Sequence, residues 1–153
     1  MRYWLMKTEP GTFGVEHLAA APRSTSAWDG VRNFQARNML RDEVRRGDQA
    51  FLYHSGAVPG IVAVMQIVKQ GYPDPTAFDR KHHHYDPDSD PANPRWFMVD
   101  VQLKRRLART IALEELRAHA GKQLKGMVLL RPGNRLSITP VEAAHWKFIL
   151  SLE

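Results

Sequence analysis

The chain has 153 residues, of which 43% are hydrophobic and 25% are charged. This length supports one domain spanning residues 1–153, and the composition argues against a disordered or fibrous protein. The absence of cysteine excludes disulfides, thiolate metal sites and cysteine nucleophiles. The net charge of +6 permits an anionic partner such as nucleic acid but does not establish one.

Neither a targeting signal nor a membrane span is expected. The apolar run Tyr3–Met6 is too short for a secretory signal. Residues 49–68 lack lysine, arginine, aspartate and glutamate, but they include glutamine, histidine, serine, glycine and proline, which do not suit a membrane span. We therefore expect no membrane association and a cytoplasmic location, or a nuclear one if the source is eukaryotic.

Short strands and short helices alternate along the chain. Apolar and alternating patterns predict strands at residues 3–7, 49–55, 60–69, 96–107 and 136–138. Helical spacing of apolar side chains predicts helices at residues 15–21, 33–46 and 113–120, followed by a last helix from Pro140. The expected class is therefore α+β, with about five mostly antiparallel strands and helices between them.

Two helix starts carry specific signals. Asn33 is a suitable N-cap, because its side-chain oxygen can accept a hydrogen bond from a free backbone N–H. Thr139, Pro140 and Glu142 form the pattern of a capping box with proline at the first helical position.

Residues 72–94 contain many prolines and aspartates and the run His82–His84, which predicts a long surface loop with a helical turn near residues 76–78. Adjacent histidines in an extended segment point in opposite directions, and no standard metal-ligand spacing is present. We therefore expect no metal site and no cofactor.

Aromatic and polar side chains form the first candidate site. They are Trp4, Lys7, Trp28, Tyr53, His54, Ser55 and Trp96. Trp28 lies in a loop of small and polar residues, where its ring can either stack on a planar base or plug the core; composition alone favours the plug. The polar groups at the end of the strand 49–55 either bond local backbone or face a ligand.

Basic side chains are concentrated in residues 95–135, which contain ten cationic and three acidic side chains. Such clustering favours a surface that contacts phosphates, with Lys104, Arg105 and Arg106 as candidates. Arg37 and Arg41 share one face of the helix 33–46 and can extend this surface. The alternative is a solvated helix face and a charged edge strand.

Catalytic motifs are missing. The sequence has no Gly-x-Ser-x-Gly, no phosphate-binding glycine loop and no zinc-deaminase signature. The alternative to a binding module is an enzyme or small-ligand binder acting on a nucleobase or nucleotide, with His54 or His82–His84 as acid, base or metal ligand.

Two strings, YWLMKTEP at residues 3–10 and WDGVRNFQARN at residues 28–38, resemble the EVE domain family, and the likeness extends over essentially the whole chain. Met6 departs mildly from the pattern, since phenylalanine is common there. The resemblance implies a PUA-like fold, a small mixed β-barrel of five to six strands flanked by helices, related to YTH, ASCH and PUA modules. It also implies a non-catalytic reader of modified bases in DNA or RNA.

The site expected from the residues and the resemblance together has two parts. The nucleobase pocket comprises Trp4, Lys7, Trp28, Arg32, Asn33, Tyr53, His54, Ser55, Arg135 and Ser137. The phosphate contacts comprise Arg37, Arg41, Lys104, Arg105 and Arg106. In this hypothesis an extruded base stacks on Trp28 while polar groups read its edge.

Overall fold

The computed structural model describes residues 1–153 and contains one six-stranded mixed sheet. The strands are β1 (Tyr3–Thr8), β2 (Thr25–Ala27), β3 (Gln49–His54), β4 (Gly60–Pro73), β5 (Phe97–Ala112) and β6 (Ile138–Val141). The helices are α1 (Val15–Ala20), α2 (Phe34–Asn38), α3 (Leu113–Ala118) and α4 (Ala143–Leu150). Shorter helical segments are η1 (Pro22–Ser24), η2 (Met39–Glu43), η3 (Pro75–Phe78) and η4 (Val128–Leu130).

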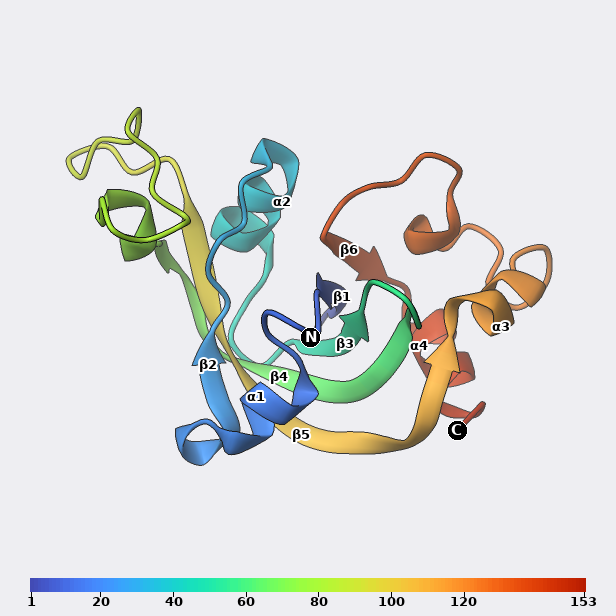
Figure 1. Ribbon diagram of the computed structural model, residues 1–153. Helices are drawn as coiled ribbons and strands as arrows, with labels where there is room; N and C mark the ends of the chain where they lie inside the picture. Colours follow the sequence, from blue (N-terminus) through green and yellow to red (C-terminus); the bar gives the residue numbers. More distant parts are fainter.

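The strand order is β2-β5-β4-β3-β1-β6. Only β1 and β3 are parallel, and the other neighbours are antiparallel. Strands β4 and β5 are long and strongly curved (Figure 1), and register shifts between them accommodate the bend. The edges β2 and β6 are not paired with each other, so the barrel-like sheet is open. The predicted α+β class, a mixed sheet of six strands flanked by helices, is confirmed.

The sheet separates two cores. Alternate residues of β1 and β3 point to opposite faces, so Trp4 and Leu52 pack in one cluster while Leu5 and Phe51 pack in the other. The first cluster is covered by α1, α2 and η2, and the second by α3 and α4. Strand β3 is therefore buried on both faces, as its uninterrupted apolar run predicts.

The last helix begins later than expected. Thr139 and Pro140 belong to β6, where they pair with Leu5 and Trp4, and α4 follows the N-cap Glu142, which makes no side-chain capping bond. Pairing with β1 therefore outweighs the local capping pattern. Proline is tolerated there because β6 is an edge strand.

Other boundaries differ less. The helix expected at residues 33–46 is divided into α2 and the wider π-helical turn η2, which ends at Glu43. The segment between α1 and Ala27 contains η1 and the start of β2. No helix has the length and apolar character needed to cross a membrane.

Candidate functional site

A pocket of about 540 Å³ opens beside the end of β1. Three chain segments form its walls: the turn after β1, the segment that follows β2, and the histidine run of the long loop. Its lining residues are Lys7, Thr8, Glu9, Thr12, Phe13, Ser26, Ala27, Trp28, Asp29, Gly30, Val31, Arg32, His82, His83, His84 and Ser137. The pocket therefore combines carboxylates, cations, hydroxyls and apolar side chains in a volume typical of small-ligand sites.

Four of the ten predicted pocket residues line this space: Lys7, Trp28, Arg32 and Ser137. Lys7 is tied to Ser137 through its backbone, whose N–H donates to the Ser137 carbonyl at 2.8 Å. Burial lowers the pKa of the Lys7 ammonium. A ligand that offers a hydrogen-bond acceptor to the Lys7 ammonium would stabilise its charged form.

Trp28 packs in the core and also borders the pocket. Its ring is 6% exposed and belongs to the core cluster that includes Leu18 and Ala36. The ring of Phe13 meets it edge-on, with centroids 6.1 Å apart. Its backbone N–H donates to the Val99 carbonyl at 2.7 Å, which fixes the segment after β2 against β5. The ring is thus a core side chain that also forms part of the pocket wall.

Three other predicted residues, Trp4, His54 and Ser55, form hydrogen bonds within the framework behind the pocket. The Trp4 indole N–H donates to the buried Asp48 carboxylate at 3.0 Å. His54 Nε2 accepts a hydrogen bond from the Val15 N–H at 3.1 Å, and burial lowers the pKa of His54, which favours this neutral acceptor form.

Ser55 Oγ donates to the Thr8 carbonyl at 3.2 Å. Tyr53 is 4% exposed and packs in the second core cluster. At the end of β3, His54 and Ser55 are thus bonded to backbone groups of segments distant in the sequence, at Val15 and Thr8, and not to the backbone of their own turn.

Asn33 is the N-cap of α2, as predicted, because its Oδ1 accepts the Ala36 N–H at 3.0 Å. Asn33 is exposed and does not line the pocket, and the same holds for Arg135. Their roles at a nucleobase remain predictions.

The Arg32 guanidinium ties two pocket walls together. It contacts the Asp74 carboxylate at 3.0 Å and donates to the His84 carbonyl at 2.8 Å. The Asp74 carboxylate also accepts hydrogen bonds from Gly30 and Thr76. Burial alone raises the pKa of Asp74, but the bonds from Thr76, Gly30 and Arg32 lower it overall. Arg32 is therefore held in the wall by protein partners.

Sequence reasoning missed the histidine run as a wall of the pocket. The chain turns at this point, where the Tyr85 N–H donates to the His82 carbonyl at 3.0 Å, so the three rings converge instead of pointing apart. Gly30 has a φ of +79°, and a Cβ on it would overlap the His84 ring. The signal available in the sequence was Trp28-Asp29-Gly30, where a glycine permits close approach.

The three histidines can supply metal ligands, since one donor atom from each lies within 4.8 Å of the others. The His82 Nδ1 already accepts the His84 N–H at 3.0 Å, so binding at His82 competes with a bond of the turn. The neighbouring Asp29 carboxylate lies 3.9 Å from His84 Nδ1, and burial lowers the pKa of His84.

Comparison with known proteins identifies the family. The sequence model described as EVE domain matches residues 2–152. The chain belongs to the EVE domain family. Zebrafish thymocyte nuclear protein 1 is 48% identical to this EVE domain, over 98% of the chain and 71% of the relative.

Solved structures resemble this EVE domain closely. Human THYN1 protein, crystallised in complex with DNA containing 5-methylcytosine, has a TM-score of 0.93 and 46% identity over 99% of this chain and 97% of its own. A Pseudomonas putida protein has a TM-score of 0.91 and 40% identity, over 98% of each chain. An ASCH protein from Zymomonas mobilis, only 10% identical, shares the fold alone with a TM-score of 0.57.

Several cations of the EVE domain expected at phosphates are paired with carboxylates. Arg105 binds Glu153 through two hydrogen bonds of 2.8 and 2.7 Å, and Arg106 binds Glu16 at 2.7 and 3.0 Å. Arg41 likewise pairs with Asp42 at 2.8 Å.

Arg37 instead donates to a backbone carbonyl, that of Arg95, at 2.5 Å. Lys104 is exposed. The unneutralised charge is therefore smaller along β5 than the sequence count suggests.

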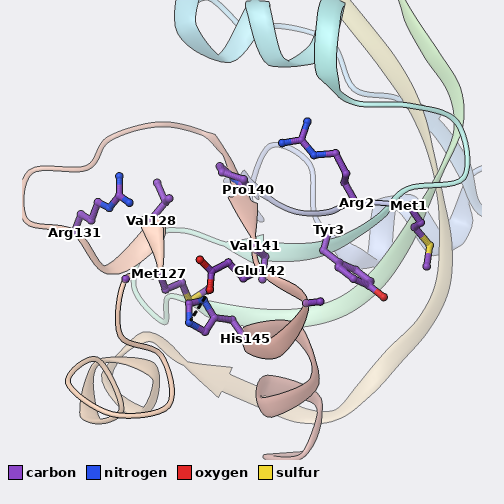
Figure 2. Close-up of a pocket in the computed structure, with 12 residues that line it drawn as sticks. Met1, Arg2, Tyr3, Met127, Val128, Arg131, Pro140, Val141, Glu142 and His145 are labelled. Carbon is purple, nitrogen blue, oxygen red and sulfur yellow. Dashed lines mark ion pairs between the residues drawn. The ribbon is translucent and has the colours of Figure 1, made fainter.

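A second pocket of about 360 Å³ lies between the start of β1, β6 and the beginning of α4 (Figure 2). Arg2 and Arg131 line it together with His145, whose Nε2 lies 3.6 Å from the Glu142 carboxylate. None of the predicted site residues line this pocket. The larger pocket is accordingly the candidate site of the EVE domain.

Proposed function

We propose that this EVE domain is a non-catalytic module that binds DNA and holds a modified base, in the first instance 5-methylcytosine, in the larger pocket. The observation that supports this most strongly is the combination of a polar and aromatic pocket with a close relative, human THYN1, crystallised with 5-methylcytosine DNA. A base in such a pocket must leave the stack, which costs a few kcal/mol that pocket contacts recover.

The pocket wall offers partners for each edge of a cytosine. The carboxylates of Glu9 and Asp29 can accept the exocyclic amino protons, as acidic side chains do at cytosine N4. The Lys7 ammonium can donate to the ring acceptors. Phe13 and Val31 supply apolar surface for a methyl group. In this proposal the acids and the lysine recognise the base, and the apolar side chains distinguish its methylation.

The backbone of the nucleic acid contacts cations outside the pocket. Arg37, Lys104 and Arg135 are all at least partly accessible, and none forms an ion pair with a carboxylate. Phosphate contacts position a protein on DNA without selecting a sequence. The non-catalytic part of the proposal is supported by the lack of catalytic motifs in the sequence.

The test is a binding panel of DNA and RNA oligonucleotides of one sequence, carrying cytosine, 5-methylcytosine or other modified bases at one position. Measurement at two salt concentrations separates phosphate attraction from base reading, because only the former depends strongly on salt. The proposal expects the methylated DNA to bind most tightly at both concentrations. Equal affinity for methylated and unmodified DNA contradicts it, and turnover of any modified nucleoside contradicts its non-catalytic part.

A further inference from the structure

One aromatic ring stands exposed close to the pocket. Phe34 is 53% exposed, and the other large exposed hydrophobic residues, Met1 and Val58, are aliphatic. Single exposed apolar side chains are common and by themselves mean little. The packing behind Phe34 is what distinguishes it.

Phe34 is held in place from behind. Its ring stacks on Trp96, with centroids 4.8 Å apart and planes at 24°. Trp96 is 6% exposed, and its indole N–H donates to the Asp86 carboxylate at 2.6 Å. Phe34 is also the first residue of α2, directly after the N-cap Asn33. The exposed Phe34 ring is therefore packed against a buried indole that is itself held by a hydrogen bond.

This aromatic pair is continuous with the pocket. Arg32 lines the pocket, and its guanidinium carbon lies 5.4 Å from the centre of the Trp96 ring. Trp96 therefore contacts both Arg32 of the pocket wall and the exposed ring of Phe34. Figure 1 shows α2 rising beside the segment that joins β4 and β5, as the Phe34–Trp96 and Arg37–Arg95 contacts require.

An arginine lies beside the ring. The Arg37 guanidinium carbon lies 5.0 Å from the centre of the Phe34 ring. One turn further along, Arg41 lies 6.0 Å from the ring of Phe97. An exposed aromatic ring with an arginine beside it suits a partner that presents bases next to phosphates.

We infer that Phe34 is a wedge that enters the base stack of double-stranded DNA beside the extruded base. This inference rests on the proposed function, because a wedge is needed only when a base leaves the duplex. Apolar side chains inserted between base pairs in this way stabilise an opened step. The backing by Trp96 keeps the ring ordered before binding, and Arg37 places a cation beside the neighbouring phosphates.

The experiment compares Phe34→Ala, Phe34→Gln and Phe34→Trp with the matched control Val58→Ala, which removes an exposed aliphatic side chain elsewhere. Three probes are titrated: a duplex with one 5-methylcytosine, the same duplex with an abasic site opposite that base, and 5-methyl-2′-deoxycytidine monophosphate. Thermal unfolding of each variant verifies folding. The glutamine variant keeps side-chain bulk over Trp96 if the alanine variant folds poorly.

Phe34→Ala is expected to weaken binding of the intact duplex about tenfold, within the range for loss of one base–aromatic stack. The affinity of this variant for the monophosphate should not change. Its loss of affinity for the duplex with the abasic site should be smaller, because the 5-methylcytosine in that duplex is already unpaired. Phe34→Trp and Val58→Ala should bind like the unmodified chain.

Equal losses on the duplex and the monophosphate, or no loss on either, would overturn the wedge. If the unmodified chain binds neither the methylated duplex nor the monophosphate, the proposed function itself fails and the wedge fails with it.

Discussion

Arg32 and Asp74 form an ion pair of 3.0 Å between residues 42 positions apart in the sequence. The pair joins the segment that carries Trp28 to the segment that carries the histidine run. The Asp74 side chain is fully buried, whereas that of Arg32 is 24% exposed. This ion pair therefore joins two walls of the larger pocket, together with the hydrogen bonds from Gly30 to Asp74 and from Arg32 to the His84 carbonyl.

Replacing Arg32 with alanine is expected to lower the free energy of unfolding by about 2–3 kcal/mol, because it leaves a buried carboxylate with fewer partners. Urea denaturation measures this change. Arg131→Ala is the matched control, since it removes an exposed arginine from the other pocket. A loss no larger than that of the control would show that Arg32 does not hold the walls together.

Stability should also depend on the ionisation of Asp74. The pKa of Asp74 is lower in the folded chain than its ordinary value, so its contribution is present above about pH 4 and is lost as the pH falls through the folded pKa. The stability difference between the unmodified chain and Asp74→Asn should therefore shrink on acidification. Denaturation curves between neutral and strongly acidic pH measure it, and a constant difference contradicts the assignment.

Trp28→Ala is expected to cost roughly 3–5 kcal/mol of stability, the usual penalty for truncating a buried aromatic ring. Trp28→Phe should recover much of that loss, because it refills part of the cavity against Phe13. Chemical denaturation and DNA affinity are measured on the same samples. A stable alanine variant with weakened binding would show that Trp28 serves only as a stacking surface.

The sequence predicted the central fold well because periodicity reports burial. The uninterrupted run in β3 and the N-cap at Asn33 both depend on local features that the structure preserves. Thr139 and Pro140 were assigned wrongly because a capping pattern is local, whereas their pairing with β1 is not. Local propensity yields to such long-range pairing.

For the same reason, the sequence predicted only four of the residues that line the pocket. Lys7 and Trp28 belong to recognisable strings, but the His84 wall is brought to them by Arg32 and Asp74 across the fold. Charge counting likewise cannot show that Arg105 is paired with Glu153, at the very end of the chain.

The salt dependence of DNA binding should locate the phosphate surface. Arg37→Ala combined with Arg135→Ala is expected to flatten the slope of log affinity against log salt, because neither cation is paired with a carboxylate and fewer counterions are released without them. Arg105→Ala combined with Arg106→Ala should change the slope less, since Glu153 and Glu16 already neutralise these cations. A larger effect from the second pair would place the DNA on β5.

The most direct measurement is the ratio of affinities for 5-methylcytosine and cytosine in one DNA sequence, determined for the unmodified chain, Asp29→Ala, Lys7→Met and Lys104→Ala. The methionine keeps the apolar stem of Lys7, while Lys104 lies outside the pocket and serves as the control. The account predicts a preference for the methylated base that falls in the Asp29 and Lys7 variants and survives in the Lys104 variant. An undiminished preference in both folded pocket variants would contradict reading of the base by this pocket.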